Sequence, residues 1–160
     1  MAYENINVNQ LRSSIRQCLN SIDYSESKEV LSSIKNNGVW NTASRNTLST
    51  ALDKLVDTRY KDLEKTLKAY LKIVDKIEEY QKLSKQIDGM NSELSTMNSN
   101  LTTAKNVGTQ LKSSNADVSK QQENDNKINN LNSQISSKKS EINSKKQDLD
   151  RLKKQIDNMI

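Results

Sequence analysis

The sequence has 160 residues, of which 32% are hydrophobic and 4% aromatic, with no Phe and one Trp; a rounded domain of this size needs more apolar side chains to fill its centre. Proline is absent and glycine occurs three times, which excludes most β-rich folds and favours long helices that bury narrow apolar stripes. The net charge of +5 comes from interleaved acidic and basic residues, a pattern typical of solvated helices and not of a nucleic-acid-binding face.

The same composition restricts the chemistry that the chain can perform. No His is present, so the commonest general base and metal ligand is missing. The single cysteine, Cys18, can form neither an internal disulfide nor a zinc cluster, and we expect it to be a small buried residue of a helix. We therefore expect no enzymatic activity, no cofactor and no metal.

The sequence begins MAYENINVNQ, which lacks the basic start and apolar core of a signal peptide. No apolar run approaches the roughly 18 residues that span a bilayer. The expectation is a soluble, cytoplasmic protein without a transmembrane segment, whose export would need a route without a classical signal.

The first predicted helical stretch covers residues 8–36. Its apolar residues, Val8, Leu11, Ile15, Cys18 and Ile22, fall three and four apart and so share one helix face. The pattern weakens between residues 23 and 28 and then resumes. Asn36, Asn37 and Gly38 supply a helix end and a turn, because Asn and Gly tolerate positive φ.

The second predicted stretch covers residues 41–112. Its spacing slips between Ile77 and Ile87, where two steps of four and one of three would take 11 residues and the chain uses 10. We expect a continuous helix with a local distortion near residues 80–89. The expected core face of its first part comprises Leu48, Leu52, Leu55, Leu63, Leu67, Tyr70, Val74 and Ile77.

A polar region rich in Asn, Ser and Asp predicts that the chain turns back within residues 112–126. The third stretch, 126–160, has regular heptads in which Lys138 and Lys145 occupy core positions. Such lysines suit an antiparallel hairpin, since their stems lie along the seam while their ammonium groups reach water. The predicted fold is all-α: an elongated helical hairpin and coiled coil with three main helices.

The segment NNGVWNTASRNTLSTAL, which carries Trp40 after the first turn, resembles the WXG family of helical hairpins from type VII secretion. The family motif is Trp-x-Gly followed by small residues; here Thr42 replaces the glycine, while Ala43 and Ser44 fit. The resemblance covers residues 1–83 and implies a WXG-like hairpin there, with Trp40 packed at its corner. Residues 84–160 form the antiparallel coiled-coil extension.

Exported members of that family carry Tyr-x-x-x-Asp/Glu near the end of the second helix. Tyr60 and Glu64 match these letters but lie early in the helix, and Tyr80 lies in the expected place with Ser84 instead of an acid. Tyr60 and Glu64 are therefore the candidate secretion motif. The resemblance better implies a cytoplasmic or co-exported partner of a larger secreted protein.

The resemblance implies a chaperone-like interaction protein that pairs with the N-terminal helical domain of a type VII secretion effector. We expect a partner-binding face that comprises Leu11, Ile15, Trp40, Leu48, Leu52 and Leu55. The alternative is a coiled-coil scaffold or spacer that self-assembles into a homo-oligomer. Nucleic acid is not an expected partner, because the charges are interleaved.

Overall fold

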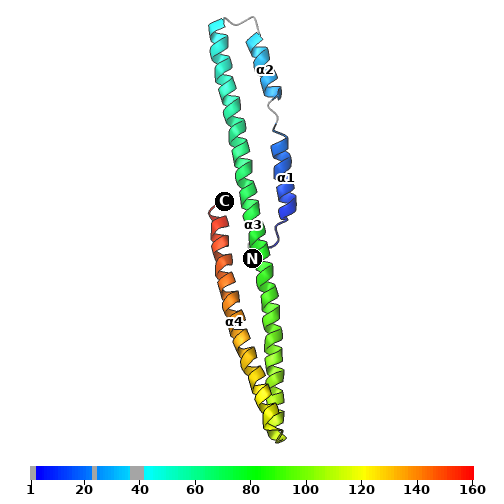
Figure 1. Cartoon of the computed structure of the whole chain (residues 1–160). Helices are drawn as coiled ribbons and strands as arrows, with labels where there is room; N and C mark the ends of the chain where they lie inside the picture. Colours follow the sequence, from blue (N-terminus) through cyan, green and yellow to red (C-terminus); the bar gives the residue numbers. More distant parts are fainter. Residues whose placement is uncertain (1–2, 23–24, 37–41) are drawn as a thin grey trace. The chain divides into compact units, whose positions relative to one another are not determined.

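The computed structural model describes residues 3–22, 25–36 and 42–160 (Figure 1). These residues form helices α1 (Val8–Asn20), α2 (Ser25–Asn36), α3 (Thr42–Ser113) and α4 (Val118–Asp157), with no strand among them. The all-α prediction is confirmed. Over the described ranges, no helix is long and apolar enough to cross a membrane.

The chain forms two compact units, and α3 contributes to both. Unit 1 contains Tyr3 and Glu4 together with Glu78–Ile160, and unit 2 contains Asn5–Ile77. The predicted division lay between residues 83 and 84. In each unit a different segment packs against its own part of α3.

The predicted stretch 8–36 is two helices instead of one. Asn7 caps the start of α1 by accepting a hydrogen bond from the Gln10 amide at 3.0 Å. At its end the Ser21 amide donates to the carbonyls of Gln17 and Cys18. The apolar spacing lapses directly afterwards, so nothing in the sequence favours continuing the helix until α2 begins at Ser25.

Unit 1 is an antiparallel helical hairpin. Lys138 of α4 pairs with Glu93 of α3 at 2.8 Å, and Lys145 donates to Gln86 at 3.4 Å, so the numbering rises on one helix as it falls on the other. Both lysines are half-buried residues of the core row. Their ammonium groups contact polar side chains of α3, whereas contact with water was predicted. Between them lies the apolar core, which contains Ile87, Met90 and Ile142 with Leu83, Leu94 and Leu149 packed against it.

The tip of this hairpin is a tight turn centred on Asn115, within the predicted region 112–126. Asn115 has a φ of 49°, a left-handed conformation that Asn adopts more readily than most residues. The Ala116 amide then reaches back to the Leu111 carbonyl at 3.1 Å, which closes the end of α3. Asp117 caps α4 through the Ser119 amide at 2.9 Å. Helix α4 consequently begins eight residues earlier than the predicted position, residue 126.

A buried polar contact lies near the tip. Asn124 of α4 is 9% exposed, and its side-chain amide donates to the Ala104 carbonyl of α3 at 3.0 Å. Gly108 lies one turn further along α3, and a Cβ there would stand 2.8 Å from the Asn124 Nδ2 atom. The absence of a side chain at residue 108 therefore makes room for this hydrogen bond.

An N-terminal clamp, defined here as Tyr3, Glu4, Tyr80, Gln81 and Asp157, joins three distant segments of unit 1. The Tyr3 hydroxyl donates to Asp157 at 2.5 Å, and its ring meets Tyr80 edge to face with centroids 5.5 Å apart. Tyr80 donates to Glu4 at 3.2 Å, and Gln81 donates to the Tyr3 carbonyl at 2.8 Å. The clamp thus holds the N-terminal segment against both α3 and the end of α4.

Hydrogen bonds in the clamp shift the pKa values of its titratable groups. The bond to Asp157 raises the pKa of Tyr3, because the neutral phenol is the donor. The pKa of Asp157 is lowered, first by a hydrogen bond from Lys153 and then by the one from Tyr3. Hydrogen bonding to its own backbone amide and to Tyr80 lowers the pKa of Glu4.

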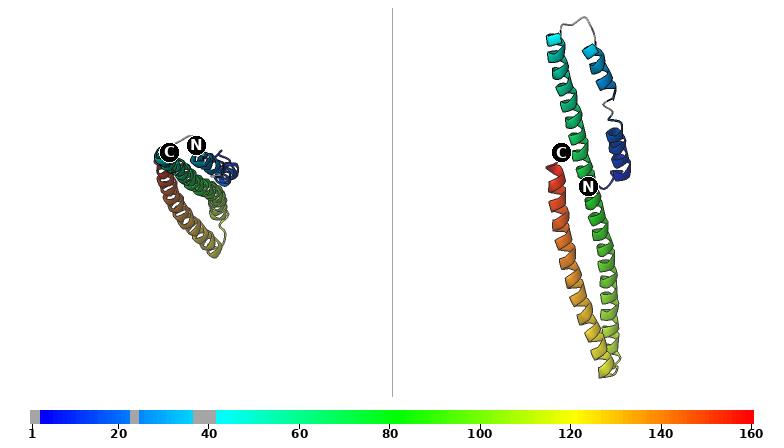
Figure 2. Two further views of the ribbon diagram at one scale, coloured as in Figure 1. Left: turned by 90° about the horizontal axis from the view of Figure 1, so that it is seen from above. Right: turned by 45° about the horizontal axis from the view of Figure 1, so that its top comes forward.

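Unit 2 pairs α1 with α3 in antiparallel fashion, while α2 continues alongside the N-terminal part of α3 (Figures 1 and 2). Arg12 of α1 bridges to Asp75 of α3 at 3.0 Å. Further along α1, Leu19 and Ile22 lie beside Glu64 and Lys68, so the α3 numbers fall as the α1 numbers rise. This pairing determines which face of α3 is covered.

Candidate helix-docking surface

The seam between α1 and α3 follows one row of half-buried or buried residues on each helix. On α1 the row rises by four and three residues through Val8, Arg12, Ile15, Leu19 and Ile22. On α3 it follows the same spacing through Tyr60, Glu64, Leu67, Leu71 and Val74. Each row is the covered face of its helix.

Several apolar side chains immediately beside these rows are exposed. Leu11 is 39% exposed on α1, and Leu63 and Tyr70 are 47% and 52% exposed on α3. Leu55, eight residues before Leu63, is 53% exposed as well, but it is displaced by about 80° around the helix from Leu63. The exposed Cys18 lies seven residues after Leu11. We call Leu11, Cys18, Leu63 and Tyr70 the apolar flank.

Helical geometry places both parts of the apolar flank on one side of the α1–α3 pair. Leu11 precedes the row residue Arg12, just as Leu63 precedes Glu64 and Tyr70 precedes Leu71. All three therefore occupy the same heptad position, next to the seam. In an antiparallel pair, equivalent flanking positions of the two helices lie on the same side of the seam. The flank is thus one apolar strip that a further helix could cover.

The residues predicted to form the partner-binding face divide into two groups. Leu11 and Ile15 lie on α1 opposite the part of α3 near Asp75. Leu48, Leu52 and Leu55 lie 20 to 27 residues earlier on α3, or roughly 30–40 Å along a helix. Ile15 is buried in the seam, and Leu48 and Leu52 are half-buried. Leu11 and Leu55 are exposed, and of these two Leu11 belongs to the apolar flank.

Two flank residues, Leu63 and Tyr70, were predicted to face the core. The apolar stripe of α3 is wide, and α1 covers only the side of it that carries Leu67 and Val74. The signal available in the sequence was the width of this stripe, which exceeds what one neighbouring helix can bury. The sequence could not indicate which edge would remain open.

The prediction that Cys18 is buried is wrong, because the structure leaves this side chain exposed. The helical face that it shares with Leu11 is correct, but the seam follows the neighbouring row through Leu19. Cys18 is therefore a flank residue and not a core residue.

Trp40 lies outside the residues that the structure describes. Tyr60 and Glu64, the candidate secretion motif, are both half-buried on the seam row of α3. Glu64 is also in an ion pair with Lys68, one turn further on. Tyr80, the other tyrosine considered for this motif, is buried in the N-terminal clamp.

No protein-family model, curated protein or solved structure matches the chain. In the described part of the chain, no three His, Cys, Asp or Glu side chains are grouped so that they could hold a metal ion. The chemistry of the apolar flank is that of helix–helix packing.

Proposed function

We propose that this chain is a non-catalytic interaction protein and that unit 2 binds a helix of another protein along the apolar flank. The observation that carries the proposal is the exposure of Leu11, Leu63 and Tyr70, which occupy the same heptad position beside the seam on two helices and are not scattered surface residues. A helix that packs beside α1 and α3 would extend the pair toward a helical bundle.

The energetics indicate what such a partner must supply. Complete burial of a Leu or Tyr side chain contributes about 1.5–3 kcal/mol, so covering these half-exposed residues gives about 1 kcal/mol each. Association costs on the order of 4–15 kcal/mol in lost freedom of motion. The three large side chains alone do not overcome that cost, so the partner helix must be long enough to make contacts beyond them.

The resemblance of residues 1–83 to the WXG hairpins supports type VII secretion as the setting. In this proposal the chain serves as a chaperone-like or co-secreted partner of an effector whose N-terminal domain is helical. The candidate motif of Tyr60 and Glu64 would then have to become accessible, since both side chains lie on the seam.

A double substitution in the apolar flank tests the proposal. In Leu63→Asp/Tyr70→Asp, two carboxylates would enter any interface at that strip, whereas both side chains are already about half exposed in the chain itself. The helical content should therefore change little while partner binding is lost. Thr102→Asp/Thr109→Asp is the matched control, because both positions are exposed on α3 and also lie seven residues apart.

The assay isolates the tagged chain from its native host and maps its contacts by cross-linking and mass spectrometry. The proposal requires a helical partner whose cross-links fall on the flank and disappear in the flank variant but not in the control. A partner that survives the flank substitutions would refute this surface. Self-association of the purified chain that the flank variant abolishes, measured by analytical ultracentrifugation, would establish the self-assembling scaffold instead.

A further inference from the structure

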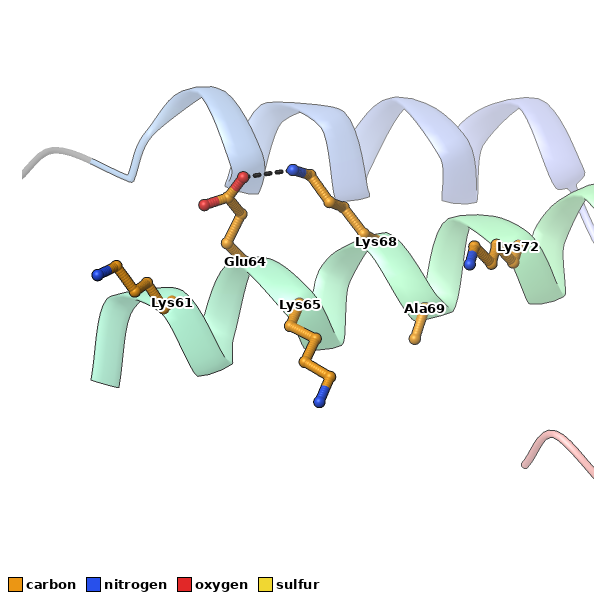
Figure 3. Close-up of a pocket in the computed structure, with 6 residues that line it drawn as sticks. All are labelled: Lys61, Glu64, Lys65, Lys68, Ala69 and Lys72. Atoms are coloured by element: carbon orange, nitrogen blue, oxygen red, sulfur yellow. Dashed lines mark hydrogen bonds and ion pairs between the residues drawn. The ribbon is translucent and has the colours of Figure 1, made fainter. Parts of the chain in front are cut away.

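A second surface of unit 2 has a different chemistry. Lys61, Lys65, Lys68 and Lys72 follow one another on α3 at steps of four, three and four residues and line a shallow groove together with Glu64 and Ala69 (Figure 3). The steps keep the four lysines on one helix face. Ala69 is the shortest side chain of the groove and leaves room above the helix backbone between its neighbours.

The four lysines are not equivalent. Lys61 pairs with Asp57 at 3.0 Å, and Lys68 pairs with Glu64. Neither Lys65 nor Lys72 has a partner in the described structure. Figure 3 shows Glu64 and Lys68 pointing toward α1, whereas Lys65 and Ala69 point away from it. Lys65, one of the two unpaired lysines, is therefore on the outward side of the groove.

We propose that this groove binds an acidic helix of a partner protein, with Asp or Glu side chains that pair with Lys65 and Lys72. These lysines are seven residues apart, about 10.5 Å along the helix, which is the repeat of one side of a packed partner helix. Ala69 and the lysine stems supply an apolar floor for small side chains of that helix, and the ammonium groups supply a cationic rim.

The charges of the groove favour a helix over a polyanion. Glu64 lines the groove itself, and Asp57 and Asp62 lie on the same stretch of α3. A phosphate backbone or an anionic membrane would meet these carboxylates together with the lysines, whereas a helix can place single acids at chosen positions. A nucleic-acid-binding face usually concentrates basic residues without such acids.

A second copy of this chain is a poorer occupant. Two pairs of its acids lie seven residues apart on α4. Glu141 and Asp148 already pair within that helix with Lys138 and Arg151, and Asp157, seven residues after Asp150, already accepts from Tyr3 and Lys153. The groove is also separate from the apolar flank, since it lies on the other side of the seam row of α3. The inference therefore does not depend on the proposed function.

The test measures binding of a fluorescent alanine-based helical peptide with Glu at every seventh residue on two adjacent rows, by anisotropy. A Gln version of the peptide is the ligand control. Lys65→Glu/Lys72→Glu in the full-length chain should weaken binding of the Glu peptide by about tenfold, from two lost charge pairs and the added repulsion. Lys139→Glu/Lys146→Glu, exposed on α4 with the same spacing and charge change, should leave it unchanged.

Raising the salt concentration should weaken binding of the Glu peptide, because exposed charges are screened. Equal loss in both lysine variants would overturn the proposal, since net charge alone would then explain binding. Equal binding of the Glu and Gln peptides would also overturn it. Tighter binding of a DNA duplex or of phosphatidylserine vesicles, lost in Lys65→Glu/Lys72→Glu, would make the groove a polyanion surface instead.

Discussion

Gly108 and Gly89 are both interior residues of α3, yet replacing each by Ala should have opposite effects. A helix-interior Gly→Ala change normally stabilises a protein by about 1 kcal/mol, because alanine restricts the unfolded chain and favours helix. At Gly89 a new Cβ would meet nothing within 4 Å, so the full gain should appear. At Gly108 the new Cβ would stand 2.8 Å from the Asn124 side-chain nitrogen.

The loss of stability in Gly108→Ala comes from the displacement of the Asn124 side chain. Its amide can move away from the new methyl group only by leaving the Ala104 carbonyl, to which it now donates at 3.0 Å. A buried donor left without a partner costs about 1–3 kcal/mol. Subtracting the helix gain of about 1 kcal/mol leaves Gly108→Ala neutral to about 2 kcal/mol destabilising, hence about 1–3 kcal/mol below Gly89→Ala.

Urea unfolding followed by circular dichroism measures this difference on the full-length chain. The double variant Gly108→Ala/Asn124→Ala identifies its cause, since removing the amide also removes the steric conflict. A double-mutant cycle should show coupling between the two positions, whereas Gly89→Ala with Asn124→Ala should show none. If Gly108→Ala stabilises the chain as much as Gly89→Ala does, the close approach of α3 and α4 at this layer is refuted.

Two further predictions concern unit 1. Ile142→Ala should lower the free energy of unfolding by about 2–5 kcal/mol, because Ile142 is buried in the hairpin core. Leu63→Ala should lower it much less, because Leu63 is half-exposed on the apolar flank. Equal losses in urea titrations would contradict the assigned core. Tyr3→Phe should lower thermal stability most between about pH 4 and pH 10, where Asp157 is ionised and Tyr3 is neutral. The lowered pKa of Asp157 means that its stabilisation is lost as pH falls through that pKa, and the raised pKa of Tyr3 means that its stabilisation is lost as pH rises through that pKa. Parallel curves for the wild type and Tyr3→Phe from pH 3 to pH 11 would show that the hydrogen bond is not made.

The sequence predicted the long helices well because their patterns are local. Residues 41–112 were expected to be helical and α3 spans Thr42–Ser113, since nothing in between breaks a helix. The regular heptads predicted for residues 126–160 agree with α4, in which Ile135, Ile142 and Ile156 lie seven or fourteen residues apart and are all buried. Asn115 illustrates the limit of such patterns, because the polar region that contains it has several residues able to end a helix.

The N-terminal clamp could not be predicted from local patterns. Tyr3 and Asp157 are 154 residues apart in the chain, and neither belongs to a periodic apolar row from which the contact could be predicted. The side of the α3 apolar stripe that stays exposed in unit 2 could not be predicted either. Leu63 and Leu67 are both leucines on one wide stripe, and only the position of α1 decides that Leu67 is covered and Leu63 exposed.

The slip in apolar spacing after Ile77 marks a change of packing partner and not the end of a helix. Helix α3 continues through residues 80–89, so the slip in apolar spacing does not interrupt the helix. Before the slip, the seam row of α3 packs against α1. After the slip, the row through Leu83, Ile87 and Met90 packs against α4, and Tyr80 contacts the N-terminal segment. One uniform heptad register would keep a single seam along the whole helix. The shift by one residue coincides with the boundary between the two units, which explains why a register defect stands in an otherwise regular sequence. The residues of α3 in the apolar flank and in the lysine groove all precede the slip, so both surfaces follow the register of unit 2. The packing of α1 against α3 therefore determines the position of both surfaces.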